Sequence, residues 1–303
     1  MLNKLFSDVA ARQAGRMDVR AVIEESARLY SLPEICLRLQ ELIVAPETDL
    51  DELSELIMLD PALTSRLLKL ANSSFYSFSG TVETVRRAVH IIGLNELYNL
   101  VLASSLTQAF SGIPPELIDM SGFWLHSVNT GLLARELGRT CGLRQGERLF
   151  VAGLLHDIGK LALITHLPEL TREAITLDGY YTAPWEREQL VLGYSFAEVG
   201  AELLKVWDMP EPLWELVACQ HAPHTARHLP AAAALVHIAS RAAAHFEQQE
   251  RGVQGFDYLG AIAPEAWRQT GLSLEALGPA RLQMDMQALD VLSIIAPKSA
   301  NLF

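Results

Sequence analysis

The sequence predicts an all-α protein. Apolar residues recur at intervals of three and four residues along most of the chain, and proline or capping residues stand where several of these stretches begin. Alternation of apolar and polar residues, the mark of a half-buried strand, is absent over any useful length. With 303 residues, 50% of them hydrophobic and 20% charged, the chain has enough apolar material for a sizeable core. We therefore expect one large multi-helix domain or two modest ones.

The first three helices are predicted from apolar stripes and N-terminal caps. The stretch 32–44 places its apolar residues on one face of a helix. Thr48 and Asp51 are three residues apart and resemble a capping box with Asp in place of the usual Glu, so a second helix should begin there. Asp60 and Pro61 match an N-cap followed by a first-turn proline, which predicts the start of a third helix.

A loop and two further helices are expected next. The stretch 72–80 is rich in serine and aromatic residues and ends in glycine, which is typical of a loop. Thr81 is predicted to cap a helix that Gly93 ends. Another helix should cover 95–109, before a break at 112–115.

The remainder of the chain continues the helical pattern as far as residue 249. The expected helices cover 122–138, 145–163, 170–177, 184–191, 197–206, 211–219 and 231–249. After Arg251, glycine and proline interrupt the chain often, and one amphipathic stretch, 279–295, is predicted to be helical. This C-terminal tail is expected to pack on the domain or to reach a partner.

Charge and cysteine usage narrow the class of protein. Acidic residues outnumber basic ones by 36 to 24, and a net charge of −12 disfavours binding to nucleic acid or to anionic lipid. The longest uncharged apolar stretch, 231–238, is far shorter than the roughly 20 residues that span a bilayer. Three widely spaced cysteines and the lack of an apolar leader at the N-terminus favour a reduced, cytoplasmic protein.

His156 and Asp157 form the first candidate for chemistry. Imidazole and carboxylate are both ligands of divalent transition metals, and the small Ala152 and Gly153 one turn earlier leave room for a ligand. Lys160 could balance phosphate charge. His126 lies 30 residues upstream on the preceding predicted helix, which would return it to the side of His156 if the two helices are antiparallel. The alternative is a pair of core histidines that are hydrogen-bonded within the protein.

A second cluster of candidate ligands lies at 219–228. Its spacing, C-x-H-x2-H-x3-H, matches no common zinc pattern and predicts a polar loop between helices. His221 is the member expected to reach the His156 region. The sequence lacks a complete phosphate loop, a G-x-G-x-x-G motif, an H-E-x-x-H motif and a G-x-S-x-G motif.

Four short stretches resemble the HDOD domain, an all-α relative of the HD and HD-GYP metal-dependent phosphohydrolases. They are 31–34 (SLPE), 60–64 (DPALT), 67–73 (LLKLANS) and 88–94. The resemblance runs from about 22 to 245. It implies an HD-domain-like bundle (111–245) with an N-terminal helical subdomain (22–110), preceded by an extension (1–21) and followed by a tail (246–303).

The resemblance also implies a metal pattern with gaps. The first histidine of the superfamily corresponds to His126, its HD pair to His156 and Asp157, and the lysine that follows in HD-GYP enzymes to Lys160. At three further ligand positions the superfamily's metal-binding residues are replaced by Phe196, Gln220 and Ser240, which cannot take their place. At a fourth position His221 keeps the histidine of the pattern. A dinuclear centre therefore looks lost, and one divalent transition metal ion at most could remain.

Two functions follow from this interpretation. The first is a non-catalytic bacterial-type signalling module that binds a protein partner or a small nucleotide-like ligand and has a degenerate HD site with no cofactor. The second is a metal-dependent phosphohydrolase that acts on a nucleotide or cyclic dinucleotide with a mononuclear or rearranged site. In the second case Lys160 would join the catalytic residues.

Overall fold

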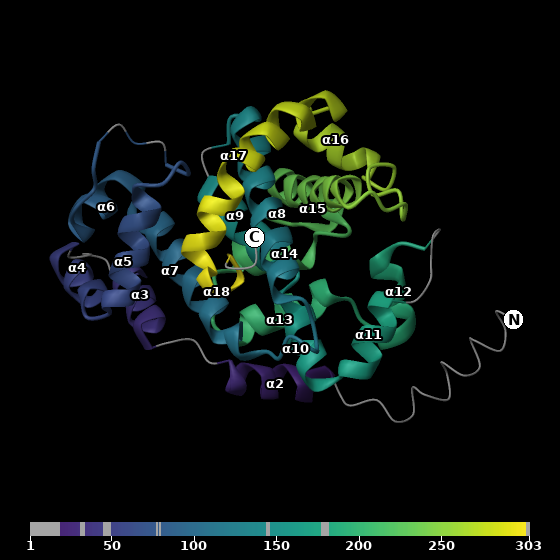
Figure 1. Ribbon diagram of the computed structural model, residues 1–303, viewed down its shortest axis with the longest axis horizontal. Coiled ribbons are helices and arrows are strands. Elements are labelled where there is room, and N and C mark those ends of the chain that lie inside the picture. Colours follow the sequence, from purple (N-terminus) through teal and green to yellow (C-terminus); the bar gives the residue numbers. More distant parts are fainter. Residues whose placement is uncertain are drawn as a thin grey trace, which may run out of the picture.

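The computed structural model describes residues 19–30, 34–44, 50–76, 78, 80–143, 146–176 and 182–300, and this part of the chain is helical and contains no strand. The all-α prediction is confirmed. Figure 1 shows a smaller group of helices beside a larger bundle, with the C-terminal helices lying across their junction.

The smaller group consists of α3 to α7, and the larger bundle is centred on α8, α9 and α15. The smaller group comprises α3 (Glu34–Val44), α4 (Leu50–Met58), α5 (Pro61–Ala71), α6 (Val85–Ile92) and α7 (Leu94–Ala109). The bundle comprises α8 (Met120–Thr140), α9 (Gly146–Leu155), α10 (Ile158–His166), α11 (Pro168–Thr176), α12 (Pro184–Leu192), α13 (Phe196–Val206), α14 (Glu211–Ala218) and α15 (Pro230–Glu250).

The chain on either side of these two groups also packs against them. At the N-terminal side, α2 (Val19–Leu29) contacts α10 and α13 of the bundle, although α3 follows it directly in sequence. At the C-terminal side, α16 (Pro264–Thr270) contacts α15, and α17 (Leu277–Ile295) contacts α8 as well as α5 and α7, followed by the short α18 (Pro297–Ala300). Helix α17 therefore joins the two groups. The sequence did not predict α16.

Two of the three predicted caps can be compared with the structure. Asp60 caps α5 as predicted, and its carboxylate accepts hydrogen bonds from the backbone N–H groups of Ala62 and Leu63 at 2.9 and 3.0 Å. The prediction that Thr81 caps the next helix is wrong, because α6 begins later and is capped by Thr84. The proposed box at Thr48 lies outside the described residues.

The reason for the later start of α6 is a side-chain clamp on Val82. Asn72 accepts a hydrogen bond from the Val82 N–H and donates one to the Val82 carbonyl, both at 2.8 Å. These two bonds occupy the backbone groups of Val82, residues 81–83 lie outside any helix, and α6 begins after Thr84.

The predicted single helix over 145–163 is also wrong, since the chain breaks between α9 and α10 at His156 and Asp157. In a continuous helix the Gly153 carbonyl would accept from the N–H of Asp157. Instead the Nδ1 atom of His156 lies 2.6 Å from that carbonyl oxygen. The side-chain amide of Gln220 donates to the carbonyl of His156 at 2.6 Å, which stabilises the break with a second side-chain hydrogen bond.

A close contact between two glycines sets the distance between α8 and α9. A Cβ atom built on Gly153 would lie 2.6 Å from backbone atoms of Gly131, a separation that real side chains do not tolerate. The two helices can therefore approach backbone to backbone, and the rings of His126 and His156 come within 5.1 Å of each other.

The stretch Gly146–His166 is the one segment in the described part of the chain with the length and hydropathy of a membrane span. Of its apolar window, 78% is buried inside the fold, as in a core helix of a soluble protein. The break at His156 and Asp157 divides it into α9 and α10.

We predict that Gly153→Ala destabilises the protein by about 1–3 kcal/mol, because the added methyl group must push α8 and α9 apart. Urea denaturation measures this loss. Gly278→Ala in α17 is the matched control, since a Cβ atom there meets nothing within 4 Å, and it should be neutral or slightly stabilising. Equal stability of Gly153→Ala and wild type would contradict the packing argument.

Candidate functional site

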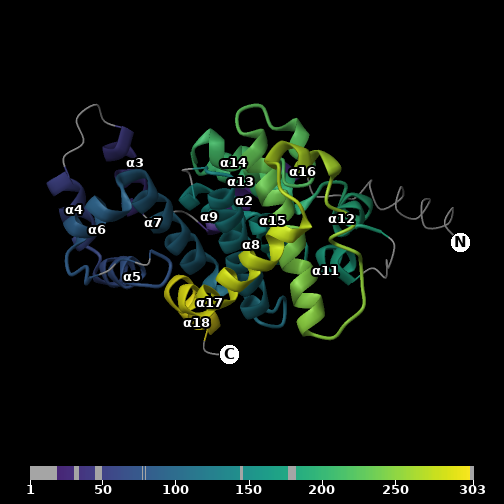
Figure 2. The same cartoon turned by 90° about the horizontal axis from the view of Figure 1, so that it is seen from above.

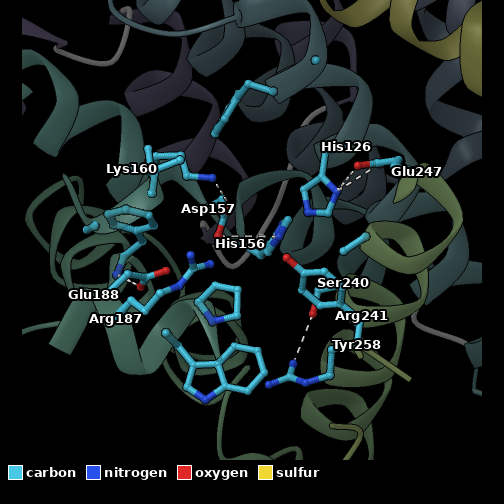
Figure 3. Close-up of a pocket in the computed structure, with 18 of the residues that line it drawn as sticks. His126, His156, Asp157, Lys160, Arg187, Glu188, Ser240, Arg241, Glu247 and Tyr258 are labelled. Carbon is cyan, nitrogen blue, oxygen red and sulfur yellow. Dashed lines mark hydrogen bonds and ion pairs between the residues drawn. The ribbon is translucent and has the colours of Figure 1, made fainter. Parts of the chain in front are cut away.

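A cavity of about 450 Å³ opens between α8, the α9–α10 break, α12, α13 and α15 (Figure 3). Every site residue predicted from the sequence lines it: His126, His156, Asp157, Lys160, Phe196, Gln220, His221 and Ser240. The segment after α15 closes one side with Tyr258. The structure therefore brings together residues that are more than a hundred positions apart in the sequence.

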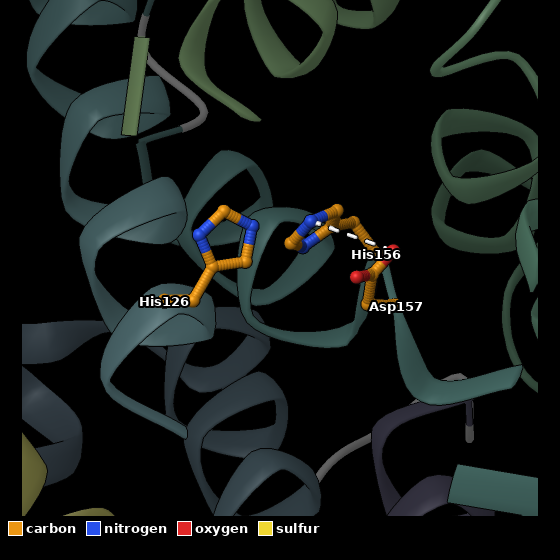
Figure 4. Close-up of side chains that lie close together, drawn as sticks. All are labelled: His126, His156 and Asp157. Carbon is orange, nitrogen blue, oxygen red and sulfur yellow. Dashed lines mark ion pairs between the residues drawn. The ribbon is translucent and has the colours of Figure 1, made fainter. Parts of the chain in front are cut away.

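His126, His156 and Asp157 form the centre of the site (Figure 4). Each offers a ligand atom, and these atoms lie within 4.8 Å of one another. The Nε2 atom of His156 is 3.7 Å from an oxygen of Asp157. Helix α8 supplies His126, and the break between α9 and α10 turns the other two side chains toward it.

Hydrogen bonds to Nδ1 orient both histidines. The Nδ1 atom of His126 lies 3.1 Å from both carboxylate oxygens of Glu247, and that of His156 lies 2.6 Å from the Gly153 carbonyl. Because these partners are acceptors, Nδ1 carries the proton when each ring is neutral, and the lone pair of Nε2 is then free. This is the arrangement in which histidines bind metals. The donor set therefore fits one divalent transition metal ion, held by the two Nε2 atoms and Asp157.

The protonation states favour the same donor set. Burial lowers the pKa of His156 to about 4, so this imidazole is neutral at physiological pH. Burial raises the pKa of Asp157, but the charges of Lys160 and the two histidines lower it more, so the net shift is downward and the carboxyl is ionised. A neutral imidazole and a carboxylate are the forms that bind cations.

Lys160 neutralises Asp157. Its ammonium group donates to one oxygen of Asp157 at 3.1 Å and lies 5.4 Å from the ring centre of Phe196. Burial lowers the pKa of Lys160, but the carboxylates of Asp157 and Glu188 more than offset this, so the net shift is upward and the group is charged. The same oxygen cannot serve freely as a ligand to a second ion.

The three positions that depart from the superfamily pattern have structural contacts of their own. Phe196 is buried at the start of α13, and its backbone N–H donates to Glu188 at 2.8 Å. Gln220 bonds to the His156 carbonyl, as described above. The hydroxyl of Ser240 donates to the His237 carbonyl at 3.2 Å.

His221 lines the cavity but lies outside the group formed by His126, His156 and Asp157. Its ring stacks on Trp185 with centroids 5.1 Å apart, and its Nδ1 atom is buried without a hydrogen-bond partner among the described residues. Burial and the neighbouring Arg241 lower its pKa to about 3. His221 is thus a neutral wall of the pocket.

The sequence analysis missed several residues of the pocket: Glu188, Arg241, Glu247, Trp185 and Tyr258. Glu247 could have been found, because it lies seven residues after Ser240 and so shares a helix face with it. Burial raises the pKa of Glu188 to about 8, which makes it a neutral acid inside the site. No local sequence pattern marks Glu188 or Trp185.

The helical bundle and the histidine–aspartate centre together define an HD-type all-α protein. A family model for the HDOD domain matches residues 29–223, and the chain belongs to this family. The resemblance stated from the sequence motifs is thereby confirmed.

Solved structures share the fold. A "putative phosphohydrolase" of Shewanella amazonensis SB2B has 25% identity and a TM-score of 0.69, with 91% of this chain and 98% of that chain covered. An HDOD domain protein with unknown function from Geobacter sulfurreducens has 22% identity and a TM-score of 0.64, with 97% and 98% covered. The second likeness concerns the fold alone.

A curated relative matches part of the chain. An uncharacterized protein of Treponema pallidum (strain Nichols) is 27% identical over 199 residues, which is 64% of this chain and 38% of that protein. The match thus spans less than half the length of that relative.

We predict that the His126–Glu247 pair stabilises the metal-free protein mainly in mildly acidic solution. Burial lowers the pKa of His126, but Glu247 more than offsets it, so the pKa is raised from 6.5. The stability that protonated His126 contributes is fully present below pH 6.5 and is lost as pH rises through the raised pKa. Burial raises the pKa of Glu247, but His126 lowers it by more, so the net shift is downward. The stability that Glu247 contributes is therefore present above pH 4.5 and is lost as pH falls through the lowered pKa.

Glu247→Gln should therefore reduce the free energy of unfolding by about 1 kcal/mol near pH 5.5 and by less near pH 8, measured in chelator by urea denaturation. Glu250→Gln, an exposed change on the same helix, is the control. A loss that is equal at both pH values would contradict the paired charge.

Proposed function

We propose that the chain is a non-catalytic regulatory module that binds a small phosphorylated, nucleotide-like ligand in the HD-derived cavity. The single observation that carries this proposal is Arg241. Arg241 is 2% exposed and lines the cavity, yet the Nε and Nη2 atoms of its guanidinium have no hydrogen-bond partner among the described residues. Burying charged donors without partners is costly, and an anionic ligand would supply the acceptors.

The carboxylates that share the cavity do not accept hydrogen bonds from these two Arg241 atoms. Asp157 is paired with Lys160 and Glu247 with His126, and Asp119 accepts from the backbone at the start of α8. Glu188 accepts from the Phe196 N–H and is neutral by virtue of its raised pKa. Arg187 and Arg251 also line the cavity and add positive charge. The guanidinium of Arg241 is held 4.2 Å from the ring centre of Trp185, whose stacking with His221 makes it rigid.

The donor set supports the non-catalytic part of the proposal. Two-metal phosphohydrolysis needs a second set of ligands to hold both ions around a bridging water. Phe196, Gln220 and Ser240 occupy those positions and are committed to packing or to backbone hydrogen bonds. The cations at this end of the cavity can hold a phosphate group, but they cannot activate water as a metal ion does.

A second candidate function is supported by the three-residue centre. His126, His156 and Asp157 could hold one divalent ion, which would supply Lewis-acid activation of a phosphoryl oxygen and a water of lowered pKa. The chain would then be a mononuclear phosphohydrolase for a nucleotide or cyclic dinucleotide, and Lys160 would neutralise charge on the phosphate.

We predict that the protein binds a cyclic dinucleotide probe in the micromolar range or tighter, measured by isothermal titration calorimetry, and releases no cleaved product. Arg241→Gln should weaken binding by about tenfold or more, as expected for the loss of a charge-assisted hydrogen bond. Because Arg241 also donates to the Gln220 carbonyl at 3.2 Å, Lys160→Met serves as a second variant. Arg268→Gln, an exposed change on α16, is the control.

Binding that is equal in wild type and both variants would contradict this ligand assignment. Metal-dependent cleavage of the probe that disappears in Asp157→Ala would replace the regulatory proposal by the phosphohydrolase.

We further propose that the module binds a protein partner through an exposed apolar stripe on α17. Leu282, Met286 and Leu289 are 60%, 68% and 56% exposed and are spaced four and three residues apart, so they lie on one face. Such a stripe fits an amphipathic helix of another protein. The net charge of −12 favours a protein partner over nucleic acid. We still expect a cytoplasmic location.

We predict that Met286→Glu leaves the melting temperature of the isolated protein unchanged, because the side chain is exposed, and abolishes complexes trapped by cross-linking in the source cells. Met284→Leu, a conservative change on the buried face of α17, is the control that should retain them. Undiminished cross-linking of Met286→Glu would exclude the stripe as the partner surface.

A further inference from the structure

A second cavity, of about 440 Å³, lies where the two groups of helices meet the C-terminal tail. Helices α5 and α7 supply one wall, the start of α8 another, and the end of α17 with α18 the third. The hydroxyl of Thr107 in α7 lies 2.7 Å from the carbonyl of Ile295, which ties the tail to α7 at this cavity. The cavity is separate from the histidine–aspartate centre.

The surface of this second cavity is mostly apolar, and its lining also includes polar side chains. The apolar lining residues include Ile113, Pro115, Met120, Trp124, Ile295 and Ala296, and the charged ones are Arg66, Lys298 and Asp119, whose carboxylate caps α8. Its size falls within the range of about 300–1,000 Å³ that small-molecule sites occupy. An apolar cavity of this size fits a hydrocarbon chain or ring better than a sugar or a nucleotide.

Two polar atoms of the lining lack partners. The hydroxyl of Ser104 is buried in a residue that is 5% exposed, and it has no hydrogen-bond partner within the described chain. The Nε atom of Arg66 is likewise buried and without a partner there. The two residues also line a small hollow together, so they lie near each other. A serine hydroxyl in a helix can donate to a carbonyl of the preceding turn. The Ser104 hydroxyl does not do so, which leaves it able to donate to an acceptor in the cavity.

We propose that this cavity binds an amphiphilic carboxylate, with its apolar body against Trp124 and its carboxylate at Arg66 and Ser104. A planar guanidinium matches a carboxylate, and a hydroxyl adds one further donor. Lys298, whose ammonium lies 3.4 Å from the Ser111 hydroxyl, adds positive charge at the cavity. Because the ligand touches α7, α8 and α18 together, its binding fixes the position of the tail relative to both helical groups.

Isothermal titration calorimetry below the micelle concentration, with decanoate, decanol and decyl phosphate as probes, tests this site. Wild type should bind decanoate about tenfold or more tightly than decanol, as expected for a charge-assisted pair. Arg66→Gln should remove this preference and leave decanol binding unchanged. Lys69→Gln, the same charge change one turn along α5 and outside the cavity, should keep the preference.

Ser104→Leu is a second variant, which fills the cavity and should weaken both decanoate and decanol. The proposal is overturned if decanoate and decanol bind equally, if Arg66→Gln retains the preference, or if decyl phosphate binds more tightly than decanoate.

Discussion

The site depends on one local conflict between a side chain and the helix backbone. The ring of His156 donates to the Gly153 carbonyl, which would accept from the N–H of Asp157 in a continuous helix, and the helix stops at this point. The stop turns His156 and Asp157 into one cavity, where the close packing of α8 against α9 brings His126 beside them. In a continuous helix the two adjacent side chains would point about 100° apart, and the break replaces that arrangement.

This geometry brings together one group of possible metal ligands, His126, His156 and Asp157, among the described residues. The two histidines hold their protons on Nδ1 and point Nε2 at the cavity, while Lys160 balances Asp157. Opposite them, positive charge from Arg241 and an aromatic wall replace further ligands. In the function proposed above, this pocket recognises an anion and does not activate water. Helix α17 touches both helical groups, which offers a route from an occupied pocket to a partner surface.

Helical periodicity and capping chemistry were enough to predict most of the fold, since both are local properties of the chain. The failures arise where a side chain bonds to the backbone. Asn72 binds Val82 ten residues later and delays α6, while His156 binds Gly153 and Gln220 binds His156 at the break that divides a predicted helix. For the site, the residue pattern alone pointed to His126, His156, Asp157, Lys160 and His221, and the resemblance added Phe196, Gln220 and Ser240. The charge of Arg241 entered only through the three-dimensional packing of α15 against α8.

The measurement that tests this account most directly is anomalous X-ray diffraction from crystals soaked in Mn²⁺. We expect no more than one ion, bound by His126, His156 and Asp157. Two ions about 3.5–4 Å apart, the spacing of a dinuclear phosphohydrolase, would contradict the conclusion that the second set of ligands is gone.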